Sequence, residues 1–269
     1  MSRIIAITGA SSGIGLALAK KLAQPGNHLI LLARRVEILE DLAAEARQAG
    51  AEATVEEIDF RVKNAWQTAH RALAKKGLEI DTIYHCAVRI SAGAVHHTLP
   101  EDWEEIYRVN LLSTTSILGT LYPEMARRGH GTIVLFTSLT SLGGGPMAAP
   151  YASAKTAILG AWRSLQYESR RTGVAVHLIS PSLVDTPIFE NFILRKVTSQ
   201  QIRQCMLATR LPITPPDVAA RKIIDNVAKG KRYIVFPLKI AIYVFFARRF
   251  PAIASSFVRQ SNRIFGIQK

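Results

Sequence analysis

The chain has 269 residues, a hydrophobic content of 48% and a formal net charge of +14. This length is enough to bury the core of a single α/β domain. The two cysteines, Cys86 and Cys205, are too few for a disulfide framework, which excludes a small disulfide-stabilised fold and is typical of a reducing compartment. The first apolar run begins at Ile4, so we expect no cleaved signal peptide before it.

Short apolar runs alternate with helical patterns along the chain. We predict strands over residues 4–8, 28–33, 53–59, 82–87, 132–137, 175–180 and 233–236. Such an alternation is typical of a parallel sheet with helices on both faces. The expected fold class is therefore α/β, a single-domain Rossmann fold with a doubly wound, seven-stranded parallel sheet. We assign this domain to residues 1–237 and a C-terminal extension to residues 238–269.

A glycine-rich turn follows the first predicted strand directly. Residues 8–15 read TGASSGIG, and a helical pattern then continues to about Gln24. Glycines between a strand and a helix let the backbone approach a pyrophosphate at the positive end of the helix. Because of this placement we favour a nucleotide site over a glycine-rich loop without a ligand. The candidate contacts are Gly9, Ser11, Ser12, Gly13, Ile14 and Gly15.

The end of the second predicted strand carries no carboxylate. In NAD sites an acidic residue at this position binds the ribose 2′-hydroxyl. Here Arg34 and Arg35 follow Ala33. Guanidinium groups suit a 2′-phosphate because they offer charge and a planar fork of donors. We therefore predict NADP(H) as the cofactor, in preference to a solvated basic pair that merely opens the next helix.

Tyr151 and Lys155 lie four residues apart, ahead of a helical pattern over residues 156–171. On a helix these two positions share one face. An ammonium beside a phenol favours the phenolate, so we expect the pKa of Tyr151 to lie below its usual value of about 10. A phenol tuned in this way can transfer a proton at working pH. The alternative is an aromatic residue and a lysine on an ordinary helix face, which the other motifs disfavour.

Together these motifs resemble the short-chain dehydrogenase/reductase family over residues 3–237. Ser138 follows the fifth predicted strand and lies thirteen residues before Tyr151, which is the usual spacing in the family. Asn110 matches the family's asparagine on the long helix after the fourth strand. The resemblance implies a catalytic set of Asn110, Ser138, Tyr151 and Lys155, with no metal.

The same resemblance implies further cofactor contacts. Asp59, at the end of the third predicted strand, matches the acid that contacts the adenine ring, and Ala87 ends the fourth predicted strand. Pro181, Val184 and Thr186 match the loop after the sixth strand that covers the nicotinamide.

Two segments depart from the family pattern. The family's Asn-Asn-Ala-Gly is His85-Cys86-Ala87-Val88 here, and Ser182 replaces a glycine. Val88 adds a side chain where glycine lets the backbone come close to the cofactor. His85 could be interpreted as an acid or base and Cys86 as a nucleophile, but at a strand end packing or bracing is the better interpretation. We assign neither a role.

Two segments are expected to form the substrate cleft. Residues 187–213 lie where the family carries its substrate lid, and they are rich in apolar side chains. Lids sequester the reacting centre from water, so an apolar lid indicates an apolar substrate. The alternative is a helix pair whose apolar face packs on the core. Residues 143–147, Gly-Gly-Gly-Pro-Met, are expected to form the other wall.

The C-terminal part is basic and aromatic. No acidic residue follows Asp225, whereas nine lysines and arginines and eight aromatic residues do. Phosphate-tracking arms are rarely this apolar, so we expect no nucleic-acid partner. An interfacial membrane segment fits better, and the uninterrupted apolar stretch is too short to span a bilayer. The alternative is packing in a subunit interface or over the cleft.

These observations predict an NADP(H)-dependent oxidoreductase that interconverts a carbonyl and an alcohol on a lipophilic substrate. Steroids, retinoids, long-chain aldehydes or ketones and 3-oxoacyl thioesters are the candidate classes. We expect a cytoplasmic homodimer or homotetramer with peripheral membrane contact through residues 238–269. The alternative function is a sensor or scaffold that binds NADP(H) without turnover.

Overall fold

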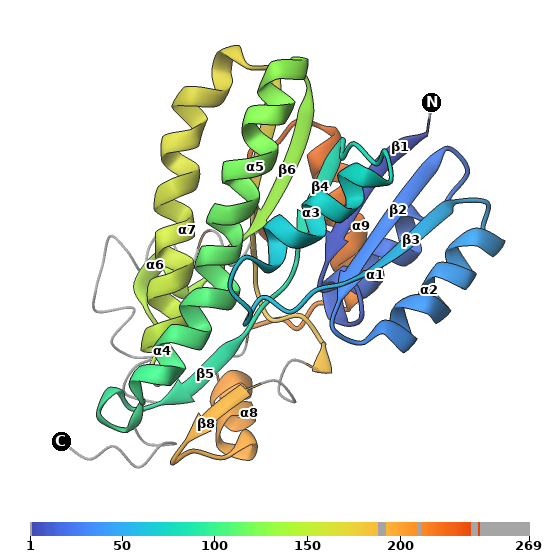
Figure 1. Cartoon of the computed structure of the whole chain (residues 1–269). Helices are drawn as coiled ribbons and strands as arrows, with labels where there is room; N and C mark the ends of the chain where they lie inside the picture. The colour runs from blue at the N-terminus through green and yellow to red at the C-terminus, as the bar shows by residue number, and fades with distance from the viewer. Residues whose placement is uncertain (1, 188–191, 209–210, 238–241, 243–269) are drawn as a thin grey trace.

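The computed structural model describes residues 2–187, 192–208, 211–237 and 242 (Figure 1). Seven strands form one sheet in the order β3-β2-β1-β4-β6-β7-β9, and every neighbouring pair is parallel. The α/β prediction and the seven strands are therefore confirmed, with ends that shift by one or two residues. The strands are β1 (Arg3–Thr8), β2 (Asn27–Ala33), β3 (Glu52–Glu57), β4 (Thr82–His85), β6 (Gly131–Phe136), β7 (Val174–Pro181) and β9 (Tyr233–Phe236).

Helices cover both faces of this sheet, because alternate strand side chains point to opposite faces. On β1, Ile5 and Ile7 join the core beneath α1 (Gly13–Leu22), α2 (Val36–Gln48) and α9 (Pro216–Ala228). Ala6, between them, joins the core beneath α3 (Ala65–Lys75), α5 (Ser113–Arg128) and α7 (Ala149–Glu168). Two helical layers thus enclose a sheet that is apolar on both faces.

The long helix expected after the fourth strand is present as an unbroken helical run over residues 100–128, and it contains a turn that was not predicted. It begins as α4 (Pro100–Ile106), passes through a π-helical turn (Tyr107–Leu112) and continues as α5. We call Tyr107–Leu112 the π turn. Such turns insert one extra residue and are frequent at functional sites.

Helix α7 begins earlier than the sequence pattern indicated. It starts at Ala149, so Tyr151 and Lys155 both lie inside it, and a short 3-10 turn (Ser169–Arg171) follows its end. The expected helical placement of this pair on one face is thus realised.

A second, two-stranded parallel sheet was not predicted. It pairs β5 (Ile90–Gly93) with β8 (Phe192–Arg195). A 3-10 turn (Val95–His97) follows β5 in the chain, and α8 (Ser199–Ala208) follows β8. A Cβ on Gly93 would lie 2.7 Å from Arg195 Cβ, so only glycine permits this close pairing. The predicted lid therefore contains a strand and a helix; its residues 188–191 and 209–210 lie outside the described part.

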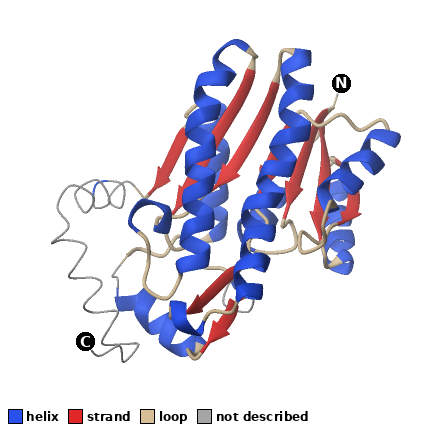
Figure 2. Cartoon of the chain, turned by 60° about the vertical axis from the view of Figure 1, so that its left-hand side comes forward, coloured by secondary structure: helices blue, strands red, loops and turns tan. Residues whose placement is uncertain are grey.

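The carboxyl ends of the main strands face this small sheet. Figure 2 shows the arrows of the main sheet pointing toward the end of the molecule where β5 and β8 lie. In open α/β sheets, ligands bind outside the carboxyl ends of the strands, where the strand order reverses. Here that reversal falls between β1 and β4.

The C-terminal extension, residues 238–269, lies outside the described residues except for Ile242, whose side chain is exposed. Within the described ranges, no helix is long and apolar enough to cross a membrane.

Candidate functional site

The glycine-rich loop connects β1 to α1 at the carboxyl edge of the sheet. A Cβ on Gly15 would lie 2.4 Å from Gly9 O, so the loop can fold this tightly only with glycine at position 15. The first N–H groups of a helix have no partner within it. Ser12, the N-cap of α1, makes no side-chain capping hydrogen bond. These N–H groups and the helix dipole therefore suit an anion such as a pyrophosphate.

The loop after β7 lies against this glycine-rich loop. Gly13 has a φ of +55°, and a Cβ built on it would lie 3.1 Å from Thr186 Cγ2. The backbone of the same loop pairs with Thr214 through the bonds Asp185 N–H to Thr214 O and Thr214 N–H to Leu183 O. The segment containing the predicted contacts Pro181, Val184 and Thr186 thus forms a wall next to the glycines.

The predicted 2′-phosphate pair divides into two different environments. Both Arg34 and Arg35 are exposed, but Arg35 folds back on the loop and donates to Ser11 Oγ at 3.1 Å and to Ser11 O at 3.0 Å. Arg34 lies near enough to Asp59 for its charge to lower the pKa of that carboxyl. Arg35 therefore supports the glycine-rich loop, whereas Arg34 is exposed and lies on the side of Asp59.

Asp59 is bound by a neighbour that the sequence reading overlooked. Arg61 donates to both of its carboxylate oxygens, from Nε to Oδ1 at 3.0 Å and from Nη2 to Oδ2 at 2.6 Å. Burial raises the pKa of Asp59, but the hydrogen bonds and charge of Arg61 outweigh it, so the pKa is lowered. Arg61 lies only two residues after Asp59 in the sequence, and this short spacing could have identified it as a partner of that carboxylate.

Ser138 and Tyr151 meet by a side-chain hydrogen bond. The Thr140 N–H donates to Ser138 Oγ at 3.3 Å. The two side chains therefore place a hydroxyl and a phenol beside one another. In residues 143–147, the segment expected to form a wall of the cleft, Met147 O accepts from the Gly93 N–H at 2.8 Å.

Lys155 is 3% exposed and lies one helical turn from Tyr151, with Nζ 5.8 Å from the centroid of the phenol ring. Its Nζ donates to Phe136 O at 3.0 Å, and its own carbonyl accepts from Thr137 Oγ1 at 2.9 Å. Both the side chain and the backbone carbonyl of Lys155 thus bond helix α7 to the end of β6. Thr137 was not among the predicted site residues.

The expected lowering of the Tyr151 pKa is wrong for the free protein. Burial raises the pKa of Tyr151 to about 12, and the hydrogen bond with Ser138 offsets only part of this. Burial also lowers the pKa of Lys155, to about 8. Desolvation disfavours whichever form is charged, and here it outweighs the attraction between ammonium and phenolate. The depth of burial, which spacing does not reveal, decides the direction.

Asn110 lies in the π turn and is 1% exposed. Its amide Nδ2 donates to Arg89 O at 2.8 Å and to Ile106 O at 2.9 Å, and its Oδ1 accepts from the Arg89 N–H at 3.4 Å. The side chain thus holds the backbone that follows β4, beside Ala87 and Val88. Its backbone carbonyl accepts from Thr114 Oγ1 at 2.7 Å.

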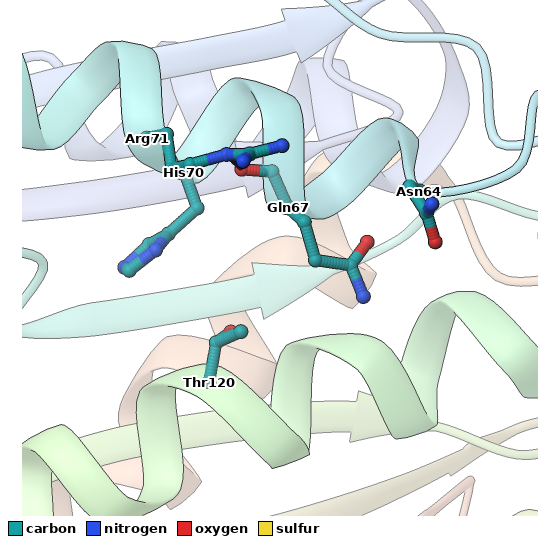
Figure 3. A pocket seen from close by; sticks show the side chains of 5 residues that line it. All are labelled: Asn64, Gln67, His70, Arg71 and Thr120. Atoms are coloured by element: carbon teal, nitrogen blue, oxygen red, sulfur yellow. Dashed lines mark hydrogen bonds between the residues drawn. The ribbon is translucent and has the colours of Figure 1, made fainter.

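A separate hollow lies between α3 and α5, on the outer side of one helical layer (Figure 3). Its volume is about 430 Å³, and it is lined by Asn64, Gln67, His70, Arg71 and Thr120. None of these belongs to the predicted site. His70 Nε2 lies 3.1 Å from Glu124 Oε2, across the two helices. Within the described ranges no group of three or more His, Cys, Asp or Glu side chains gathers as a metal site.

Comparison with known proteins identifies the family to which this fold and this site belong. The family model for short chain dehydrogenases matches residues 3–196. A fatty acyl-CoA reductase from Acinetobacter baylyi is 30% identical over 234 residues, which cover 86% of this chain and 75% of the relative. The chain belongs to the short-chain dehydrogenase/reductase family and is an oxidoreductase of that family.

Two solved structures share the fold at low identity. A short-chain dehydrogenase from Sphingobium yanoikuyae in complex with NADPH is 21% identical, with a TM-score of 0.78 and coverage of 97% of this chain and 96% of that one. A relative from Burkholderia phymatum in complex with NAD is 22% identical, with a TM-score of 0.82 and coverage of 94% and 95%. Both cofactors thus occur on this fold.

Proposed function

We propose that this protein is an NADP(H)-dependent reductase of lipophilic carbonyl compounds. The observation that carries the proposal is the cluster of half-buried Ser138 and Tyr151 with buried Lys155 at the sheet edge, beside a helix N-terminus whose N–H groups suit a pyrophosphate. A nicotinamide cofactor supplies or accepts the hydride when it is bound. The remaining steps are carried out by this chain's own residues.

The proton is assigned to Tyr151. Because burial raises the pKa of its phenol to about 12, Tyr151 is protonated at neutral pH, which is the form that a reduction requires. As hydride reaches the carbonyl carbon, the phenol donates its proton to the oxygen, and the products are an alcohol and a tyrosinate. Ser138 donates a hydrogen bond to the same oxygen and stabilises its developing charge. Lys155, at 5.8 Å from the ring, stabilises the tyrosinate.

Asn110 is assigned a supporting role. Its side chain is bonded to Arg89 and Ile106, so it holds the loop after β4 rather than contacting the reacting atoms. Its family counterpart implies that it also holds a water between Lys155 and solvent.

The choice of NADP(H) over NAD(H) rests on Arg34. It follows β2 at the position where NAD sites carry an acidic residue, and it is exposed. Replacing Arg34 with serine removes a charge-assisted contact worth ~1.5–3 kcal/mol. We expect a weaker affinity for NADPH and an unchanged affinity for NADH, measured by the fluorescence of the bound nicotinamide.

Two further variants make this test specific. Arg35→Ser also loosens the loop through Ser11, so it should weaken both cofactors. Arg163, an exposed arginine on α7, provides a matched control for the loss of charge. Equal losses of NADPH and NADH binding in Arg34→Ser would contradict the assignment.

The lipophilic substrate class rests on the cleft walls and on one relative. The predicted lid contributes β8 and α8, and its Leu207 side chain is exposed. The name fatty acyl-CoA reductase, given to the Acinetobacter relative, supports a long-chain substrate. We would add long-chain aldehydes, 3-oxoacyl thioesters and steroid ketones to the NADPH-loaded protein and follow the nicotinamide absorbance. Binding of NADPH without turnover of any of these would favour the sensor function instead.

The C-terminal extension is proposed to hold the protein reversibly at an anionic membrane surface. The motive is its sequence alone, since basic and aromatic residues alternate over residues 238–269 without an acid. Full-length protein should sediment with anionic vesicles more than with neutral ones, and added salt should release part of it. A truncation after residue 237 should stay in solution and still bind NADPH. A truncated protein that changes its oligomeric state, dimer or tetramer, would identify the extension as a subunit contact.

A further inference from the structure

His85 is a buried polar side chain that the proposed reaction does not use. It is the last residue of β4 and is 3% exposed. Its ring Nδ1 lies 2.8 Å from Thr8 Oγ1, and its Nε2 lies 2.8 Å from Ser113 Oγ. Both partners are also buried, at 0% and 4% exposure. The imidazole therefore bridges the end of β1 and the start of α5.

The surrounding hydrogen bonds determine which ring nitrogen carries the proton. Ser113 Oγ donates to Val109 O at 2.6 Å, so its hydrogen is committed and it must accept from Nε2–H. In a neutral ring Nδ1 is then an acceptor, and it takes the Thr8 hydroxyl hydrogen. Thr8 Oγ1 in turn accepts from the Ala87 N–H at 3.1 Å. Every hydrogen in this chain of bonds has one acceptor.

The two ends of the bridge lie in the two parts of the site. Thr8 directly precedes Gly9, whose backbone packs so closely on the segment after β4 that a Cβ would lie 3.0 Å from Ala87 N. Val109, which accepts from Ser113, directly precedes Asn110 in the π turn. The bridge thus connects the glycine-rich loop to the turn that holds Asn110.

We propose that His85 is a positioning residue that sets the spacing between the cofactor loop and the π turn carrying Asn110. It acts through Thr8 on one side and through Ser113 on the other. It does so as one fixed neutral tautomer and exchanges no proton with the substrate.

The environment of the ring agrees with a neutral brace. Burial, together with the charge of Lys155, lowers the pKa of His85 to about 3. The ring of Phe60 packs against it edge to face, with centroids 5.3 Å apart. A second proton on the ring would point at the Thr8 hydroxyl, whose oxygen already accepts from the Ala87 N–H.

The kinetic test separates the two arms of the bridge and rests on the proposed function. Thr8→Val removes the loop arm and should weaken NADPH binding by about 2- to 10-fold at nearly constant kcat. Ser113→Ala removes the π-turn arm and should lower kcat by a similar factor at nearly constant NADPH affinity. His85→Phe removes both arms and should show both losses.

Coupling between the variants supplies the control. In the His85→Phe background, adding Ser113→Ala should change kcat no further, because the interaction is already absent. His85→Asn, which can retain only the Thr8 arm, should resemble Ser113→Ala. If the losses in kcat add independently in the double variant, the proposal is overturned. It is also overturned if the variants lose only stability and show no division between NADPH affinity and kcat.

A direct test of the ring does not depend on any activity. In nitrogen-15 spectra of the imidazole groups, His85, assigned by its absence in His85→Asn, should show a proton on Nε2 that persists unchanged between pH 5 and 8. A proton on Nδ1, or a titration in that range, would overturn the proposal. If the protein neither binds nor oxidises NADPH, the proposed function fails, and these spectra alone decide the role of His85.

Discussion

The burial of Lys155 should make the stability of the free protein depend on pH in a defined window. Its pKa falls from 10.5 in the unfolded chain to about 8 in the folded protein, mainly through burial. Between these two values the unfolded chain binds more protons than the folded one. The free energy of unfolding therefore rises with pH across this window, and it is unaffected by this group below it.

The pKa difference determines the size of the effect. A fall from 10.5 to about 8 corresponds to about 3 kcal/mol for the full window. Between pH 7 and pH 9.5 about 2 kcal/mol of this should be observed. The value for the full window, about 3 kcal/mol, also estimates how much burial of the ammonium lowers the free energy of unfolding at neutral pH.

Lys155→Met provides the comparison, because it keeps an unbranched chain and removes the charge. Denaturant unfolding of both proteins without cofactor, at pH 7 and pH 9.5, isolates the contribution of this residue, since all other titrating groups are shared. The wild type should gain about 2 kcal/mol more than the variant over this interval. Parallel pH dependences in the two proteins would refute a buried Lys155 ammonium with a lowered pKa.

Three further variants test the site. Tyr151→Phe should bind NADPH normally and lose turnover by ~10²–10⁴-fold, and near wild-type kcat would contradict its role as proton donor. Gly15→Ala should abolish cofactor binding, because the new Cβ would lie 2.4 Å from a backbone oxygen. The control is Gly160→Ala, whose new Cβ meets nothing within 4 Å, and this variant should bind NADPH normally. Calorimetric titration with NADPH distinguishes the two variants. Asp102→Asn breaks the paired hydrogen bonds of 2.7 Å to Arg195 on β8 and should raise the KM of the carbonyl substrate with NADPH affinity retained. An unchanged KM would show that this pair does not shape the cleft.

The sequence predicted those parts of the fold that depend on local pattern. The apolar runs identify the central strands of the main sheet because these are buried on both faces, and the glycines at positions 9, 13 and 15 identify the first turn. The edge strand β3 is only partly buried, but its position in the alternating pattern was still sufficient to predict it. Tyr151 and Lys155 come together because helix geometry fixes an i, i+4 pair. These features are set within a few residues and need no knowledge of the tertiary structure.

The missed features depend on contacts between distant segments. β5 pairs with a strand about a hundred residues later, as in Ile90 opposite Phe192, and neither strand carries a distinctive pattern. The bridge made by His85 joins Thr8 to Ser113, which lie 77 residues before and 28 residues after it. The pKa of Tyr151 depends on how deeply it is buried, and neighbours in the sequence do not reveal this depth.

The site combines two requirements that oppose each other. A reaction at Tyr151 needs a dry environment, because electrostatic interactions are stronger away from water. The same dryness lowers the pKa of Lys155 and so weakens the charge that would stabilise the tyrosinate. The structure limits this conflict by giving the ammonium a carbonyl acceptor at the end of β6, Phe136 O, which helps to keep the proton on Nζ. The position of Lys155 is thus set by the sheet, through Phe136 and Thr137, as much as by the helix that carries it.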